Sequence, residues 1–520
     1  MTGFEHLLRP YSDEEQGALL SLNEKLLDAL EELDESVLCS DEHIDLQLMR
    51  GAAFLEMEQI LQFDWRKRDP EEYLPLFAIY QLTVRQTDNF AAALCQRLRH
   101  IPEYLLNARH YIGQEPERIP APWFESTVTA VESGIEFLRS LPEVPRVKAC
   151  ASELSHLAEL IDDAVGAFER YHRFLEQDIG ARASGDFAVG NQRFSHLLRY
   201  RHFLNVSPEE LFEFGNRLFD QTEQQLKHVC RRLTGGEDLA ALEEKIHQES
   251  APDTPLISTY REQMEAAREF TLARDLVSFP DVESLHVVQT PVFLRHKIPF
   301  AAYEAPSPGD REQLGRYFVT PAADAQTLAR HNLMDMMHTS VHEGYPGHHL
   351  QFTTAHRYSA ASTLPRLLNK SATLYEGWAL YCEQLMFEKG FLNKPESEFI
   401  LLKDRLWRAL RIILDTAMQT RGLSLEDGIR MMIDRLGFSR AQSLGEATWY
   451  SRAPAVPMGY ATGWAMINTA RGLVLPEPSS QSLKMFHDKL LAQGSCALSL
   501  ALKQSFSEEI SERVVASIRE

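Results

Sequence analysis

Apolar residues recur with the spacing of an α-helix through most of this chain, and this periodicity limits its possible folds more than any other feature. The segment from Glu15 to Leu33 carries one stripe of leucines at helical spacing, Leu19, Leu20, Leu22, Leu26, Leu27, Leu30 and Leu33. A helix with such a stripe packs by one face. The pattern covers residues 1–180 and returns from residue 322 to the C-terminus. We therefore predict a mainly α fold.

A different pattern occupies residues 279–321. Here apolar residues cluster in short runs flanked by proline and glycine, Leu285, Val287, Val288, Val292 and Phe293 and then Tyr317, Phe318 and Val319. Short runs of β-branched and aromatic residues between turn residues are typical of strands. We expect a small β-element near residues 285–320.

The charge and the cysteines exclude several classes of protein. The 520 residues include 53 basic and 75 acidic side chains, a formal net charge of −22, which repels phosphate backbones and anionic lipids. We therefore expect no nucleic acid and no membrane as partner. The six cysteines show no C-x-x-C spacing, so neither a disulfide framework nor a thiolate metal site is indicated.

The sequence also bears on cellular location. No basic segment followed by an apolar run opens the sequence, and no run approaches the ~20 apolar residues that span a bilayer. We therefore predict a cytoplasmic protein.

The segment VHEGYPGHHL has a density of imidazoles and carboxylate that packing does not require. Histidine is a common zinc ligand, and Glu343, directly after His342, is placed to act as general base on a metal-activated water. In a regular helix His348 and His349 would stand too far along the axis from His342 to share one ion. Pro346 supplies a bulge that could draw the later histidine back. We favour His348 as the second ligand because the helix must be distorted less to bring it close to His342, and His349 is the alternative.

Two glutamates downstream are candidates for the third ligand. Glu376 and Glu383 stand seven positions apart in the segment LYEGWALYCE, whose other face is apolar. Glutamate is rarely buried unless it is paired or bound to a metal. A solvated polar face is the alternative for both. Gly377 favours Glu376, because a residue without a side chain lets a backbone or an ion approach closely.

A stripe of charges follows on the next expected helix, residues 399–421. Asp404, Arg408, Arg411 and Asp415 are separated by four, three and four positions, opposite a face rich in leucine and isoleucine. Salt bridges within the helix explain this spacing simply. Alternatively, Arg408 or Arg411 could pair with a carboxylate of the metal site or bind a substrate carboxylate, which a guanidinium matches in geometry.

A segment rich in glycine and proline carries two phenols and a further cation, Tyr450, Arg452 and Tyr460. A phenol can donate a hydrogen bond to a developing oxyanion without changing charge near neutral pH. Gly459 would let the chain beside Tyr460 move to meet substrate. We predict Tyr460 as this donor, Tyr450 as the next candidate and Arg452 as a third substrate-binding arginine, with ordinary loop packing as the alternative.

Together these motifs resemble the bacterial domain-of-unknown-function family DUF885, whose members look like zincin-type metallopeptidases. Its H-E-x-x-P-G-H-H segment is matched by residues 342–349, and its E-G-W-A-L-Y-x-E segment by residues 376–383. The resemblance implies a large helical, gluzincin-like fold around a deep cleft. It divides the chain into an N-terminal helical scaffold, 1–180, and a catalytic zincin-like region, 181–520, which together form one unit around that cleft.

The resemblance also implies roles for single residues. His342, His348 and Glu376 would hold Zn²⁺, and Glu343 would be the base. His349 and Glu383 would lie at the metal or behind its ligands. Three positions depart from the family's pattern. Gln419 stands where histidine is usual, Trp449 where arginine is usual, and Pro454-Ala455-Val456 where Pro-Gly-Gln is usual.

We therefore predict a zinc-dependent hydrolase that cleaves an amide or peptide bond, with a peptide or a small amide-containing molecule as substrate. Exo- and endo-cleavage are both compatible with the motifs. The departures at Gln419 and Trp449 motivate an alternative, a zinc amidase or tailoring enzyme acting on a specialised small metabolite. A helical binding module with a structural metal site is the non-enzymatic alternative. Glu343 argues against this alternative, because a structural site needs no base. The number of candidate ligands also argues against it, because a structural zinc site usually has four protein ligands and the sequence offers three.

Overall fold

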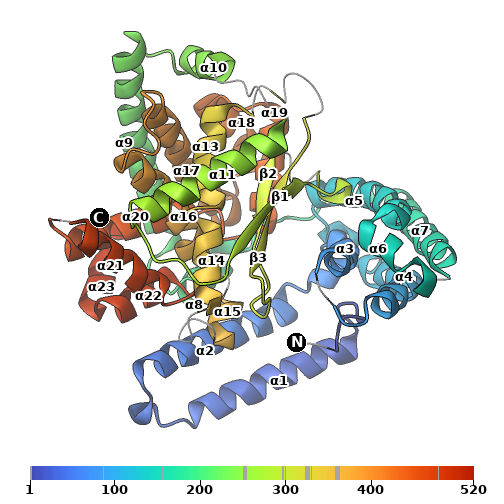
Figure 1. The fold of residues 1–520 in the computed structure, drawn as a ribbon. Helices are drawn as coiled ribbons and strands as arrows, with labels where there is room; N and C mark the ends of the chain where they lie inside the picture. The colour runs from blue at the N-terminus through green and yellow to red at the C-terminus, as the bar shows by residue number, and fades with distance from the viewer. Residues whose placement is uncertain are drawn as a thin grey trace. The chain divides into compact units, whose positions relative to one another are not determined.

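A computed structural model of the chain describes residues 3–85, 87–154, 156–249, 255–295, 298, 300–322, 328, 331–357, 363–369, 371–477 and 479–520. The fold is mainly α with one small β-sheet, which confirms the predicted fold class (Figure 1). The chain forms two compact units. Unit 1 comprises Met1–Leu26, Glu56–Phe187 and Thr290–Pro299, and unit 2 comprises Leu27–Leu55, Ala188–Gln289 and Phe300–Glu520.

This division differs from the expected ranges 1–180 and 181–520 in three places, the first being the main boundary, which lies after Phe187. Helices α1 (Asp13–Glu31) and α2 (Ser40–Gln62) each contribute residues to both units, and Thr290–Pro299 returns to unit 1.

Unit 1 is helical throughout its described part. Beyond its shares of α1 and α2, its α-helices are α3 (Leu76–Val84), α4 (Phe90–Ile112), α5 (Ala121–Ser140), α6 (Pro145–Ala149) and α7 (Leu157–Phe174). Helices α4 and α5 both pack against α7. Leu98, Ile101 and Phe168 are fully buried in this core, as the apolar stripes of amphipathic helices require.

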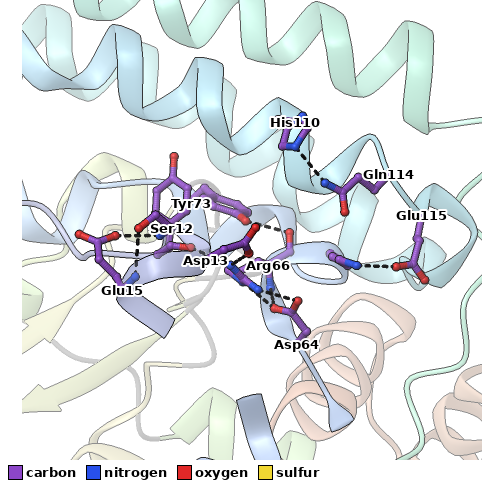
Figure 2. A network of polar contacts seen from close by, with 11 residues as sticks. Ser12, Asp13, Glu15, Asp64, Arg66, Tyr73, His110, Gln114 and Glu115 are labelled. Atoms are coloured by element: carbon purple, nitrogen blue, oxygen red, sulfur yellow. Dashed lines mark hydrogen bonds and ion pairs between the residues drawn. The ribbon is translucent and has the colours of Figure 1, made fainter. Parts of the chain in front are cut away.

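A buried arginine ties the short segments of unit 1 together (Figure 2). The guanidinium of Arg66 donates to Asp64 at 2.8 Å and to Asp13 at 2.7 Å, while the hydroxyl of Tyr73 donates to the backbone carbonyl of Arg66 at 2.8 Å. Because a buried cation is tolerated only with such partners, the network fixes the start of α1 against the turns that precede α3.

Unit 2 contains the remaining α-helices and the three β-strands of the described residues. Its helices are α8 (Gly190–Tyr200), α9 (Pro208–Thr234), α10 (Leu239–Glu249), α11 (Leu256–Ala273), α13 (Leu333–Glu343), α14 (His348–Arg357), α15 (Leu364–Leu368), α16 (Ala372–Glu388), α17 (Ser397–Thr420), α18 (Leu425–Leu436), α19 (Arg440–Arg452), α20 (Gly459–Val474), α21 (Ser480–Leu491), α22 (Leu498–Ser505) and α23 (Glu508–Arg519).

The β-element predicted near residues 285–320 is confirmed as a three-stranded sheet of unit 2. Strand β3 (Leu314–Val319) lies in the middle, parallel to β1 (Ser284–Gln289) and antiparallel to β2 (Ala301–Glu304). Tyr317 of β3 packs with Met264 of α11 and Met336 of α13 in one buried cluster. The sheet therefore supports α13, next to which it is drawn in Figure 1, and α13 ends in the histidine–glutamate motif.

Helices α16 and α20 approach each other closely through glycines. A Cβ added to Gly463 would lie 2.0 Å from the carbonyl oxygen of Thr373, and one added to Gly377 would lie 2.5 Å from the backbone of Gly463. Gly377 thus admits a neighbouring backbone, one of the two uses expected for it. The contact brings the first turn of α20, with Tyr460, towards Glu376 of α16.

Candidate metal centre

The two histidines of the first motif lie on different helices. Helix α13 ends at Glu343 and α14 begins at His348, so the helix is interrupted rather than bulged as predicted. The amide of Gly347 donates to the carbonyl of Val341 at 3.1 Å, which folds the chain back on α13. A Cβ on Gly347 would lie 1.9 Å from the carbonyl oxygen of His342, so the turn accepts only glycine there.

The turn is also held from α16. The peptide bond between Tyr345 and Pro346 is cis, and the indole nitrogen of Trp378 donates to the carbonyl of Pro346 at 2.8 Å. Trp378 is fully buried and lies two residues after Glu376. One helix therefore both fixes the turn and presents a carboxylate to the histidines on either side of it.

Three potential ligand atoms from α13, α14 and α16 converge. Oε2 of Glu376 lies 3.2 Å from Nε2 of His348 and 3.6 Å from Nε2 of His342. Tetrahedral zinc with bonds of about 2.0–2.1 Å separates its ligand atoms by about 3.3 Å, so this spacing fits one ion. Oε2 of Glu376 is buried and accepts no well-formed hydrogen bond from the described residues. A carboxylate oxygen in that state is costly unless it meets a cation, and the three residues could therefore hold a metal.

The charges around these atoms favour a cation. Burial opposes the charged form of His342, but its contacts with Glu376 and Glu383 outweigh burial and raise its pKa to about 10. Burial acts against ionisation of Glu376 too, yet the imidazoles of His348 and His342 lower its pKa from the ordinary value. A positive charge placed between the three side chains is thus stabilised.

Glu383 supports His342 from behind. Its Oε1 lies 2.7 Å from Nδ1 of His342, and both side chains are buried. If Nδ1 carries the proton, Nε2 is left with its lone pair directed at the side where Glu376 lies. This is the arrangement in which a carboxylate behind a histidine orients it for a metal.

Glu343 borders the same space from the end of α13. Burial holds its pKa above the ordinary value for glutamate, while the imidazoles of His348 and His342 act in the opposite direction. Its side chain retains partial exposure. A carboxylate in this environment can accept a proton from a water next to the metal ligands.

His349 makes its contacts elsewhere. Its Nδ1 lies 3.1 Å from the hydroxyl of Tyr303 on β2, and its Nε2 lies 2.9 Å from Oε2 of Glu283. Despite burial, the hydrogen bonds from His349 and Tyr345 lower the pKa of Glu283 to about 2. Of the two candidates for second ligand, the geometry favours His348, and His349 links α14 to the sheet.

Tyr460 lies beside the convergent ligands. Its ring is nearly parallel to the imidazole of His342, with centroids 6.3 Å apart. Burial and the negative charge of Glu376 raise the pKa of its phenol well above the ordinary value, so the hydroxyl stays protonated and can donate. The guanidinium of Arg411, which is buried, lies 4.4 Å from the centroid of the Tyr460 ring.

Tyr450 has a different position from the one predicted for a catalytic donor. Its buried hydroxyl donates to Glu446 at 2.6 Å and accepts hydrogen bonds from Nε of Arg411 at 3.1 Å and from the indole of Trp407 at 3.3 Å. Because these partners occupy the hydroxyl, Tyr450 fixes Arg411, and Arg411 in turn packs on Tyr460.

The other two predicted cations, Arg408 and Arg452, lie on α17 and α19. Arg408 donates to Asp404 one turn earlier on its own helix at 2.6 Å, which is the simple salt bridge that the spacing allows. Asp404 belongs to a second group of potential ligands with His338 and Glu383. Arg452 is the last residue of α19 and is half-buried.

Gln419, one of the positions that depart from the family's pattern, forms hydrogen bonds with backbone groups through its side chain. Its amide nitrogen donates to the carbonyl of Tyr450 at 3.0 Å, and its side-chain oxygen accepts from the amide of Val189 at 3.1 Å. Nearby, Asp415 accepts from the amides of Ala455 and Met458. Both side chains therefore position the chain between α19 and α20.

Two residues near the centre were missed in the sequence. Glu283 stands alone before β1 and carries no motif, so only the fold could reveal its bond to His349. His338 is buried on α13, with neither ring nitrogen bonded to a described group. Its position four residues before His342 was a usable signal, because this spacing puts two imidazoles on one helix face.

A profile of the family described as "Bacterial protein of unknown function (DUF885)" matches residues 1–504. The chain belongs to this family. The family membership expected from the two motifs is thereby confirmed. None of the curated proteins compared with the chain is similar to it.

Two solved structures share the fold of this DUF885 protein. A candidate lipoprotein of unknown function from Shewanella oneidensis has a TM-score of 0.74 at 19% sequence identity, with 96% of this chain and 94% of that chain covered. A candidate lipoprotein from Colwellia psychrerythraea has a TM-score of 0.76 at 16% identity, with 99% and 93% covered. At these identities the likeness extends to the fold.

The cytoplasmic location predicted from the sequence is contradicted, because both of these chains are described as candidate lipoproteins. The prediction was drawn from the lack of a leader pattern and of a long apolar run. A protein can be held at a membrane by covalent lipid without any spanning segment, so the second feature does not indicate location. None of the described helices has the length and apolar character of a membrane span.

Proposed function

We propose that this DUF885 protein is a zinc-dependent hydrolase that cleaves an amide or peptide bond. The observation that carries the proposal is the convergence of Nε2 of His342, Nε2 of His348 and Oε2 of Glu376, which accepts no well-formed hydrogen bond from the described residues. Glu343 is close enough for the charges of both imidazoles to act on it. Two imidazoles and one carboxylate are a ligand set that zinc uses in catalysis.

The residues divide the chemistry between them. When bound, zinc would supply Lewis acidity, which polarises a substrate carbonyl and lowers the pKa of water. Glu343 takes the proton from the attacking water and delivers it to the leaving amine. Tyr460 donates to the carbonyl oxygen as negative charge develops there. Glu383 holds the ring of His342, and Arg411 holds the ring of Tyr460.

The alternatives have less support. Among the described residues the convergent group contains three potential ligands, whereas a structural zinc site usually has four. The other enzymatic alternative, a zinc amidase or tailoring enzyme acting on a specialised small metabolite, was suggested by Gln419 and Trp449. The side chain of Gln419 forms hydrogen bonds with backbone groups. Glutamine at this position therefore affects the conformation of the loop, and it does not support an unusual substrate.

The test combines metal analysis with hydrolysis. We expect about one zinc per purified chain and cleavage of peptides in a mixed library, read by mass spectrometry. Chelation should stop cleavage and added zinc should restore it. Glu343→Gln should retain zinc without cleavage, and Glu262→Gln, an exposed change on α11, is the matched control. Zinc without hydrolysis of any amide would indicate a structural site, and a chain that binds no zinc would refute the proposal.

A further inference from the structure

A cavity of about 320 Å³ lies in unit 2 beside the candidate metal centre. Phe352 of α14 and Tyr375 of α16 form part of its wall. The ring centroids of both residues lie 6.1 Å from that of His348. Two aromatic side chains that line the cavity are therefore also neighbours of a predicted metal ligand. Its volume is near the lower end of the range for small-molecule pockets, about 300–1,000 Å³.

A guanidinium without a counter-charge lines this cavity. Arg201 follows the last turn of α8, and the one hydrogen bond of its side chain to the described residues is a long contact of 3.4 Å with the carbonyl of Pro454. It forms no ion pair with the described carboxylates. Asp415, the carboxylate whose charge acts on Arg201, already accepts hydrogen bonds from two backbone amides. A cation withdrawn from water without a partner is costly, and a ligand anion would relieve that cost.

The other described lining residues make Arg201 the one full positive charge of the cavity. His356 also lines it, but burial lowers the pKa of this imidazole to about 4, so it is neutral near pH 7. Leu367 and Val456 extend the apolar wall formed by the aromatic rings. One guanidinium in an apolar setting suits a single carboxylate attached to a hydrophobic group, because its two parallel donors match two carboxylate oxygens. Arg193, whose positive charge acts on Arg201, does not line the cavity, so a phosphate dianion would meet only one cation among the lining residues.

We propose that Arg201 binds the free C-terminal carboxylate of a substrate whose last, hydrophobic residue enters this cavity, so that the protein removes C-terminal residues. This inference rests on the proposed hydrolase function and adds the substrate class. Hydrolysis releases the terminal residue with its carboxylate intact, as water adds hydroxyl to the carbonyl carbon and a proton to the leaving amine.

The first experiment compares two peptides that differ in one group. N-acetyl-alanyl-phenylalanine carries the carboxylate, and its C-terminal carboxamide does not. We expect wild-type kcat/KM to be at least about 10-fold higher for the acid, the effect of one charge-assisted pair. Arg201→Met should bring the ratio near one while the carboxamide is still cleaved, and Arg201→Lys should restore part of it. Arg199→Met, an exposed change on the same helix, should leave the ratio unaltered.

A binding measurement separates this inference from the proposed function. The same two peptides are titrated calorimetrically into the full-length Glu343→Gln protein as purified, with and without Arg201→Met. Tighter binding of the acid that is lost in Arg201→Met supports the role of Arg201. Equal binding of acid and carboxamide, a preference that survives Arg201→Met, or no binding of either peptide overturns it. Absence of zinc or of hydrolysis would overturn the proposed function, and the titration would still decide whether Arg201 selects a carboxylate.

Discussion

Nδ1 of His342 lies 2.7 Å from Oε1 of Glu383, a contact between two buried side chains that leaves Nε2 of the same ring on the side of Glu376. This pair depends on α13 and α16 being in register, which the turn at Pro346 and the indole of Trp378 maintain. The orientation of the first predicted ligand is thus determined by a residue that need not touch the metal.

We predict that Glu383→Gln weakens zinc binding by about 10- to 100-fold, the usual cost of losing a partner behind a ligand. The carboxamide can still accept from Nδ1, but it brings no negative charge to the imidazole. Competition with a chromophoric chelator measures the affinity. Glu262→Gln should match wild type, and unchanged affinity in Glu383→Gln would remove the supporting role from Glu383.

The two neighbouring histidines should respond oppositely to alanine. His348→Ala removes a predicted ligand and should abolish stoichiometric zinc. His349→Ala should keep zinc but leave buried Glu283 without one of its donors, a loss of about 1–3 kcal/mol in the free energy of unfolding. Metal analysis and thermal melting of both variants measure the two effects. Zinc retained in His348→Ala and lost in His349→Ala would exchange the assignments.

Glu343→Gln should bind zinc as wild type does and lose turnover by about 10²- to 10⁴-fold, because the carboxamide keeps the shape of the side chain and cannot take the proton. Metal analysis and steady-state kinetics on the same preparation separate binding from chemistry. A rate near that of wild type would mean that another group accepts the proton.

Much of the fold could be predicted because helical periodicity and the short apolar runs before residue 320 are local properties of the sequence. The candidate ligands could be predicted for the same reason, since His342, His348 and Glu376 lie in compact motifs. The interruption between α13 and α14 could not, because it depends on Trp378 from another helix and on the lack of space beside Gly347. The sequence indicates that proline distorts the helix, and tertiary contacts determine whether the distortion is a bulge or an interruption.

The roles of Arg201 and Glu283 could not be predicted from the sequence, because they depend on contacts between distant parts of the chain. Arg201 faces a cavity with Phe352 and Tyr375, residues of α14 and α16 that stand far from it along the chain. That no described carboxylate forms an ion pair with Arg201 is a property of the assembled unit and not of any local pattern. Tyr450 had the residue type expected of a donor, but its partners Arg411 and Glu446 assign its hydroxyl to a supporting network.

Tyr460 and Tyr450 should therefore differ as phenylalanine variants. Tyr460→Phe should lower turnover by about 10²- to 10³-fold, the cost of one donor to a developing oxyanion. Tyr450→Phe should have a smaller effect, because it acts through Arg411, and it should also lower the melting temperature by leaving buried polar partners unpaired. Kinetics and melting of both variants test this order. Unchanged turnover and Michaelis constant in Tyr460→Phe would exclude it as the donor.

Acid should destabilise the protein through buried neutral histidines, of which His487 on α21 has the best-defined contacts. Its Nδ1 lies 2.7 Å from the carbonyl of Leu276 and its Nε2 lies 2.8 Å from the hydroxyl of Tyr381, so the neutral ring donates once and accepts once. Burial lowers its pKa from 6.5 to about 4. Between these values the unfolded chain binds the proton more readily, so the free energy of unfolding falls with falling pH, by about 3 kcal/mol over the whole window. Melts at several pH values should show a shallower decline for His487→Gln than for wild type, and parallel declines would contradict this role.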